Sequence, residues 1–460
     1  MELADRSCVN QEGNNVGSNA PSTTKYNGHQ SQQLKDQILE EEYDFVAHRQ
    51  VEKPTNVLET TGHLIKGTIG GGLLGIHESF MKCGLWTSIA ATILFGCFLT
   101  YCVHILVKSA QVLCKRLKTP QMSYPDLAEK SIEVAPFPSL KKFSKIFRYM
   151  VDVIVCIDQF GTCCVYQIII AKTLQGLVEG GNKDGSISML RLYLLALLLP
   201  VLLLCMITSL KYLAPFTFIA NVFIALCVTA TIVYAINVPD KKEMTAWKNF
   251  DGFFEFCGVV VFSMNGVAVS LPIENTMAKP KQFPVVISLA MFVSTTFLVM
   301  VGFFGYWGFG DTLRTPVMEN FPKGGLSTAL KGLMAFMIFI TFALCFWGGF
   351  VLVWHYLKMR HPKENHYIWE RVYRALLVIA ITVIAIIFPN MGNMMGLIGS
   401  FCLFNNGFIF PAVIETLVVW EHPGLGPGKW RLWKNIFIFS IGFILFLSGT
   451  YTNGKALLGF

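Results

Sequence analysis

Two short segments interrupt long apolar stretches with residue types that break a helix. The first is Gly67-Thr68-Ile69-Gly70-Gly71-Gly72, and the second is Ser263-Met264-Asn265-Gly266, which Pro272 follows. Glycine and proline both destabilise helices, and the end of a helix leaves backbone N–H and carbonyl groups without partners. Such groups can bind the anionic and cationic ends of a small molecule without a metal ion.

Titratable side chains flank the first interruption. His63 precedes Gly70 by seven residues, which is about 10 Å along a helix at roughly 1.5 Å per residue. An imidazole titrates near neutral pH and can alternate between its two protonation states, although a neutral, hydrogen-bonded structural histidine is the competing interpretation. His77 and Glu78 follow the interruption. A charged group in an apolar segment is a functional hypothesis by default, but adjacent residues face different sides of a helix.

The sequence gives weaker support for protease or metal chemistry. Gly308-Phe309-Gly310-Asp311 fits the GxGD pattern of intramembrane aspartyl proteases, but the aspartate that should follow a tyrosine in a neighbouring helix is missing, since Tyr43-Asp44 lies in a polar segment. The 13 cysteines form no CxxC pair and no metal-ligand spacing, and most of them lie in apolar runs. The sequence therefore predicts no enzyme, no metal site and no cofactor.

The composition shows where these groups must sit. The chain is 53% hydrophobic and 14% charged, against roughly 25% charged residues in ordinary globular proteins. A soluble fold cannot cover that much apolar surface, and a disordered chain has the opposite composition. The formal charge of +8 is spread over short loops, so no basic stripe for a nucleic acid exists. The sequence predicts an integral membrane protein whose surroundings are the lipid bilayer.

Eleven apolar stretches are each long enough to cross roughly 30 Å of hydrocarbon as a helix. They are continuous rather than alternating, which excludes a β-barrel and predicts an all-α protein. The stretches lie near residues 61–83, 86–112, 146–177, 189–208, 214–237, 252–277, 283–308, 327–357, 367–389, 391–419 and 431–452.

The ends and loops give the expected orientation. Residues 1–55 are polar and then acidic, and this predicts a disordered tail ahead of a membrane domain over 56–460. Lys and Arg are more frequent in the loops that share a side with this tail, above all in 114–145. The positive-inside rule then predicts a cytosolic N-terminus, and eleven spans place the C-terminus outside.

The two interruptions fall in the first and sixth stretches, five spans apart. Corresponding breaks in two halves of a chain indicate a transport site between inverted repeats. Close helix packing is the alternative, because Gly67/Gly71 and Gly71/Gly75 both fit GxxxG. Three consecutive glycines and a matching break in the sixth stretch favour the transport site.

The same regions carry a family resemblance. The segment from His48 through Gly67 resembles the entry to the first helix of proton-coupled amino acid transporters, a family of the amino acid and auxin permease group. Further matches run in the right order from about residue 43 to 455. They are Gly70, Gly72, Leu73 and Leu74, Gly266 through Pro272, Asn275-Thr276-Met277, Gln282-Phe283, Gly305-Tyr306 and Phe309-Gly310.

The resemblance implies a five-plus-five inverted-repeat, leucine-transporter-like fold with broken helices 1 and 6, and symport of a small neutral amino acid with a proton as the coupling ion. His63 is the residue it singles out for coupling. The substrate carboxylate is expected on the N–H groups of Gly70, Gly71 and Gly72, and its ammonium group on carbonyls near Ser263 and Asn265. Gly266 belongs to the same break, and Phe262 is expected to cover the site.

Four departures from the family pattern leave alternatives open. Ile76-His77-Glu78 replaces the usual proline region, and Asn265 stands where the sixth helix often carries an acid. Loops 178–188 and 309–326 lack the cysteines that some members pair, and the eighth helix around Trp347 does not align. We hypothesise that Glu78 supplies the titratable group that Asn265 lacks. A proton-independent facilitator and an amino acid sensor with little flux are the alternatives.

The remaining expectations concern carboxylates and location. Asp158 and Glu415 lie deep in spans, where pairing with Lys66 or Lys172 is expected. The plasma membrane is the first expectation for location and the lysosomal or endosomal membrane the second. No feature of the sequence identifies a protein partner.

Overall fold

The computed structural model describes residues 43–49, 51, 54–179, 187–207, 215–238 and 244–459. By internal contacts the chain divides into Met1–Asp44 and Phe45–Phe460. Residues 1–42 of the expected tail lie outside the described residues. Phe45 is buried and Arg49 bonds within the second unit, and the expected boundary at residue 55 stays a prediction.

The described part of the second unit is helical, with one isolated β-bridge between Thr55 and Met277. Eight of its elements are long and apolar enough to cross a membrane, and a shorter apolar helix covers Val222–Ile236. Each predicted apolar stretch corresponds to one helix or one interrupted helix. The continuous ones are α4 (Leu85–Leu117), α7 (Ser144–Val178), α8 (Ile187–Cys205), α9 (Pro215–Ile236), α12 (Phe283–Phe309), α13 (Gly325–Leu357), α14 (His366–Ile387) and α17 (Trp430–Leu458).

Two of the described spans are interrupted. The first consists of α2 (Val57–Thr68), the 3-10 turn η1 (Gly71–Leu74) and α3 (Ile76–Cys83), and the sixth of α10 (Phe250–Ser263) and α11 (Val267–Asn275). The breaks predicted in the first and sixth spans are thus confirmed. The tenth span runs as one helix from Met391 to Val419, as predicted, with two π-helical stretches inside it. Its segments are α15 (Met391–Ile398), η8 (Gly399–Leu403), η9 (Asn405–Ile409) and α16 (Phe410–Val419).

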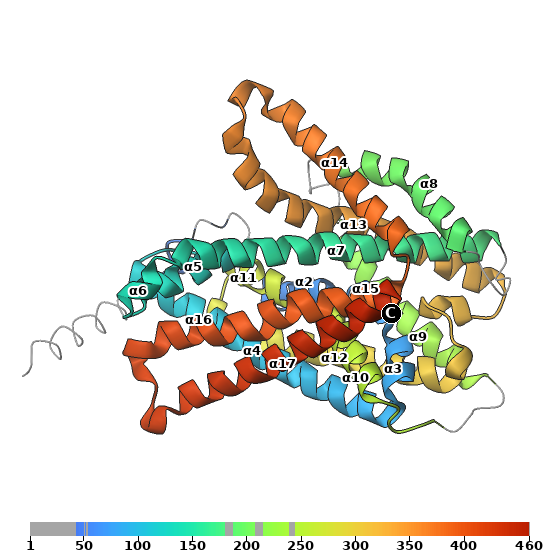
Figure 1. Ribbon diagram of the computed structural model, residues 1–460, viewed down its shortest axis with the longest axis horizontal. Coiled ribbons are helices and arrows are strands. Elements are labelled where there is room, and N and C mark those ends of the chain that lie inside the picture. Colours follow the sequence, from blue (N-terminus) through green and yellow to red (C-terminus); the bar gives the residue numbers. More distant parts are fainter. Residues whose placement is uncertain are drawn as a thin grey trace, which may run out of the picture. The chain divides into compact units, whose positions relative to one another are not determined.

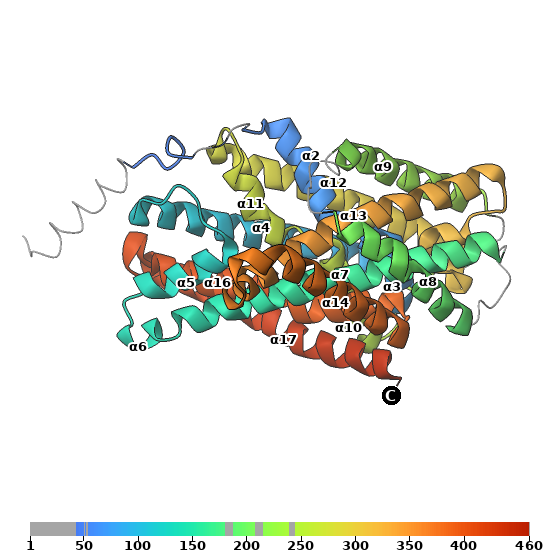
Figure 2. The same cartoon turned by 90° about the horizontal axis from the view of Figure 1, so that it is seen from above.

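The element order gives two sets of five spans followed by α17, with a break in the first span of each set. Because five is an odd number, the second set starts from the opposite side of the membrane, and the two broken spans run antiparallel. Helix α7 packs against α13, α14 and α15. Figure 1 shows α14 and α8 on one side of α7 and α4 and α17 on the other. From above, α2 and α9 lie along one edge and α17 along the opposite edge (Figure 2).

One feature of the loops lies outside the sequence predictions. The long loop after α4 folds into α5 (Tyr124–Val134) and the short α6 (Pro138–Lys141). Ser123 caps α5, since its hydroxyl accepts a hydrogen bond from the Asp126 N–H at 3.3 Å, and such caps stabilise a helix start. Tyr124 of α5 then donates a hydrogen bond to the Asn406 carbonyl at 2.6 Å, which ties this loop to the π-helical part of the tenth span.

Candidate functional site

The break in the first span begins where α2 ends at Thr68. The Thr68 hydroxyl lies 2.9 Å from the Leu64 carbonyl and 2.8 Å from the Ser294 hydroxyl on α12. It therefore satisfies part of the helix end and holds that end against a neighbour. Ile69 and Gly70 are extended, with Ile69 at φ −89° and ψ 99° and Gly70 at φ −107° and ψ −153°. As the first residues of η1, Gly71 and Gly72 have N–H groups without partners inside that turn.

The glycines of this break are required by space. A Cβ atom on Gly71 would lie 2.7 Å from Cε1 of Tyr166, and one on Gly72 would lie 2.6 Å from Cα of Ser263. Real Cβ atoms do not approach other atoms that closely. A Cβ on Gly67 would also meet Val269 at 2.9 Å. Close packing and helix interruption, which stood as alternatives for this segment, are both present.

The two breaks lie against each other. Gly72 packs on Ser263 at the end of α10, and Gly266 at the start of α11 packs on the Thr68 side chain. The Ser263 hydroxyl donates to the Val259 carbonyl at 2.7 Å, so its own bonding stays within α10. The predicted residues Gly72, Ser263 and Gly266 are therefore brought together by the fold.

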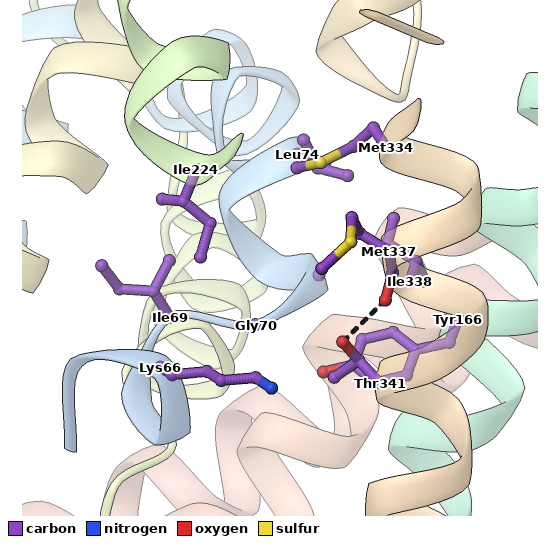
Figure 3. A pocket seen from close by; sticks show the side chains of 11 residues that line it. Lys66, Ile69, Gly70, Leu74, Tyr166, Ile224, Met334, Met337, Ile338 and Thr341 are labelled. Atoms are coloured by element: carbon purple, nitrogen blue, oxygen red, sulfur yellow. Dashed lines mark hydrogen bonds between the residues drawn. The ribbon is translucent and has the colours of Figure 1, made fainter. Parts of the chain in front are cut away.

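A small cavity of about 40 Å³ lies beside the first break. Figure 3 shows the Lys66 side chain extending across it toward Thr341 and Tyr166, with Met334 and Met337 above. The space suits a few water molecules and is well below the roughly 300 Å³ of ordinary ligand pockets. The cavity is thus too small for an amino acid. The lining residues include Lys66, Ile69, Gly70, Gly71, Leu74, Tyr166, Ile224, Met337 and Thr341.

Two predicted substrate residues point elsewhere. Phe262 is buried and lies against Gly399 of the tenth span, and it is absent from the cavity lining. Asn265 faces α7, where its Nδ2 atom lies 2.9 Å from Oδ2 and 3.1 Å from Oδ1 of Asp158. Gly70 and Gly71, by contrast, do line the cavity.

The expected carboxylate pairs are wrong. Asp158 is fully buried, and its hydrogen-bond partner is Asn265 rather than Lys66 or Lys172. Glu415 pairs with Lys434 of α17 at 2.6 Å. The sequence did not predict the Glu415–Lys434 pair, because the two side chains meet only when α16 packs against α17.

The predicted coupling residues occupy different surroundings. His63 is exposed on α2. Glu78 accepts a hydrogen bond from the Thr315 hydroxyl at 2.6 Å and lies 3.4 Å from the Lys82 ammonium group. Its neighbour His77 is buried, with Nε2 2.8 Å from the Arg314 carbonyl. Their roles in proton transfer stay predictions.

Polar contacts hold both ends of the broken spans. At the end we call the Lys82 end, Lys82 also pairs with Glu255 of α10 at 2.8 Å. At the opposite end, which we call the Arg49 end, the Arg49 guanidinium pairs with Glu274 of α11 at 3.0 Å. Gln111 donates to the same carboxylate at 2.8 Å. The sequence singled out Arg49 for its family resemblance but predicted no contact for it.

Tyr166 is the main site residue that the sequence did not reveal. Its hydroxyl lies against Gly70, and its ring lies against Gly71. A tyrosine in a 35-residue apolar helix carries no distinguishing signal, since the face that meets the break depends on tertiary packing. Within the described residues, no group of three or more His, Cys, Asp or Glu side chains is arranged to hold a metal ion.

Comparison with known proteins gives consistent matches over most of the chain. Residues 53–453 match the family model described as transmembrane amino acid transporter protein. The proton-coupled amino acid transporter-like protein pathetic of Drosophila melanogaster is 32% identical over 429 residues, covering 91% of this chain and 88% of the relative. The probable amino acid transporter skat-1 of Caenorhabditis elegans is 26% identical over 419 residues, covering 88% and 90%.

A solved structure is similar in its overall course. It is a Na⁺-coupled sialic acid symporter in a substrate-bound outward-open state, with a TM-score of 0.47 and 11% sequence identity. The match covers 92% of this chain and 95% of that one.

Proposed function

This chain belongs to the transmembrane amino acid transporter family, and from that premise we propose that it moves small neutral amino acids across a membrane together with protons. One observation carries the proposal. The breaks in the first and sixth spans touch at Gly72 and Ser263, and a cavity runs beside the first of them along Gly70, Gly71 and Tyr166. Paired breaks of this kind supply backbone groups for a zwitterion at mid-membrane depth.

Each end of the substrate has a candidate partner. The N–H groups at the start of η1 and the Tyr166 hydroxyl are hydrogen-bond donors suited to a carboxylate. The carbonyl groups freed where α10 ends at Ser263 are acceptors suited to an ammonium group. The cavity beside the first break must widen before a substrate enters, because about 40 Å³ holds no amino acid.

Small and neutral side chains fit this lining best. Ile69, Leu74, Met334 and Met337 are apolar, and an apolar wall offers nothing to a charged substrate side chain, which would be desolvated without compensation. Lys66 is the cation that reaches the cavity. Its ammonium group favours a carboxylate in the cavity and disfavours lysine or arginine as cargo.

Proton symport supplies sufficient energy for accumulation. A pH difference of one unit is worth about 1.4 kcal/mol, or tenfold in substrate concentration. A potential of 100 mV adds roughly 2.3 kcal/mol per net charge moved. We place the N-terminus in the cytosol, and propose the plasma membrane first and a lysosomal or endosomal membrane second. The name of the Drosophila relative includes proton coupling, which supports proton symport.

The test is uptake of labelled glycine, alanine, proline and leucine by cells that carry the protein at their surface, near pH 5.5 and pH 7.5, with and without sodium. Uptake that rises in acid and ignores sodium is expected. Uptake independent of pH would replace symport with facilitated transport. Surface expression without uptake would point to a sensor instead.

A pair of glycine substitutions checks the site itself. Gly72→Ala forces Cβ into the Ser263 backbone, so we expect uptake to fall at least tenfold. Gly62→Ala is the matched control on the same span, because its Cβ would meet nothing within 4 Å. Normal uptake by Gly72→Ala at equal surface expression would show that the contact between the two breaks is not part of the site.

A further inference from the structure

Asp158 stands apart from the other carboxylates of the spans. Its side chain is fully buried in α7, and its carboxylate oxygens accept hydrogen bonds from the amide nitrogen of Asn265. Glu274, Glu415 and Glu78 each have a lysine or arginine partner within 3.4 Å. Within the described residues, no ion pair to Asp158 is formed. A lone carboxylate in a membrane interior is costly unless it is neutralised.

The groups that face Asp158 are neutral. They are Asn265 at the break of the sixth span, and thiols on three surrounding segments: Cys345 on α13, Cys402 on η8 and Cys163 further along α7 itself. Lys66 is close enough to act on Cys345 but makes no ion pair with Asp158. Among the described residues, the group that bonds to the carboxylate of Asp158 is the neutral amide of Asn265.

Asp158 and Asn265 do not use all of their hydrogen-bonding atoms. Asn265 Oδ1 is buried and has no hydrogen-bond partner. An ionised carboxylate only accepts hydrogen bonds, so it can use the Asn265 amide nitrogen but never its oxygen. A protonated carboxyl group has an O–H donor, and an acid and an amide side by side form two hydrogen bonds. The Asn265 amide could also be placed the other way round, with its oxygen facing Asp158. Two acceptors would then face each other, so the carboxyl group would again need a proton.

We propose that Asp158 binds the transported proton and that Asn265 links its protonation state to the break in the sixth span. One proton from the solution on the side of entry neutralises the carboxylate, and the same proton leaves on the other side when Asp158 ionises again. Neutralisation lets the site close over a zwitterion without burying a net charge. The inference rests on the proposed symport. It names a proton site that His63, exposed on α2, and Glu78, paired with Lys82, do not provide.

The decisive experiment measures labelled alanine in proteoliposomes in two modes, as pH-driven accumulation and as exchange against unlabelled alanine at equal pH. Asp158→Asn imitates the neutral acid. We expect it to lose the acid stimulation of accumulation by at least tenfold while exchange stays within about threefold of the native protein and no longer varies with pH. Asp152→Asn is the matched control on the same helix, where Tyr356 bonds to the carboxylate, and it should keep the native acid stimulation ratio.

Two further variants guard against poor folding of Asp158→Asn. Asp158→Glu keeps a titratable group, and Asn265→Ala removes the donors that stabilise the ionised form. Each should move the pH midpoint of uptake, with Asn265→Ala moving it to higher pH. Native acid stimulation in Asp158→Asn, or unchanged midpoints in both other variants, would overturn the role of Asp158 alone. If uptake by the native protein were not stimulated by acid, the proposed proton symport would be wrong, and the proton site that rests on it would be wrong too.

Discussion

The two ends of the broken spans are held by ion pairs of different character. At the Arg49 end, the side chains of Arg49 and Glu274 are 3% and 2% exposed. The guanidinium also donates to the Glu274 carbonyl at 3.1 Å and to the Pro120 carbonyl at 2.8 Å. At the Lys82 end, one lysine that is 28% exposed is shared between Glu78 and Glu255.

This difference indicates which end opens more readily. A buried guanidinium with fixed partners is expensive to disrupt, because each separated ion would lose its compensation. A part-exposed lysine exchanges its partners for water at little cost. The N-terminal segment adds backbone bonds at the Arg49 end, where Thr55 N–H donates to the Thr276 carbonyl at 2.9 Å and Ala278 N–H to the Thr55 carbonyl at 3.1 Å. The contacts that hold the broken spans are therefore stronger at the Arg49 end than at the Lys82 end.

The largest effect is expected from Arg49→Met. It leaves Glu274 buried without its cation, and the loss of one partner of a buried pair costs about 3–5 kcal/mol. The Arg49 end should then open, with at least a tenfold loss of concentrative uptake and a lower thermal midpoint in detergent. Both are measurable on the purified protein.

A double-mutant cycle sharpens this prediction. Arg49→Met combined with Glu274→Gln removes both charges, so the double variant should recover part of the stability that Arg49→Met loses. Gln keeps a side chain that can still bond to Gln111. Additive losses in the cycle would show that the two side chains do not interact, and the comparison between the ends would fail.

A smaller effect is expected from Lys82→Met. The lysine is part-exposed, and such pairs contribute on the order of 1 kcal/mol or less. Uptake should change by no more than about fivefold, and the thermal midpoint should move less than in Arg49→Met. Lys323→Met, an exposed lysine in the loop before α13, is the control. A loss as large as that of Arg49→Met would make the two ends equivalent.

The smallest effect concerns Glu319, in the loop that also holds Thr315 at the Lys82 end. Burial raises the pKa of this carboxyl group above its usual value of 4.5, although Lys331 lies 3.1 Å away. The folded state then binds the proton more tightly than the unfolded state, so stability falls as the pH rises above 4.5 toward the folded pKa.

Glu319→Gln removes this titration. Its thermal midpoint should fall less than that of the native protein between pH 4.5 and pH 7.5, by on the order of 1 °C. Glu364→Gln, exposed in another loop, should follow the native curve. A steeper fall in Glu319→Gln would mean that the Lys331 pair, rather than burial, dominates this site.

The sequence was a reliable guide to the elements and a poor one to their contacts. Hydrophobic stretches of sufficient length predict spans, and the glycine cluster and the Ser263–Gly266 segment predict the two breaks. The α5 helix and the π-turns of the tenth span were not predicted. Helix α5 is short and amphipathic, and the π-turns begin without a proline or a glycine cluster. Phe262 was expected over the site and lies instead against Gly399.

What the sequence determined by itself is the number of spans, their breaks and the family, since these depend on local composition and order along the chain. Only the tertiary structure decided that Gly72 meets Ser263, that Tyr166 closes on Gly71, and that Asp158 faces Asn265 rather than Lys66. The physical reason is that the bilayer constrains each helix to cross but leaves its rotation and neighbours to side-chain packing. The pairing of buried charges follows from that packing, and no spacing along the chain encodes it.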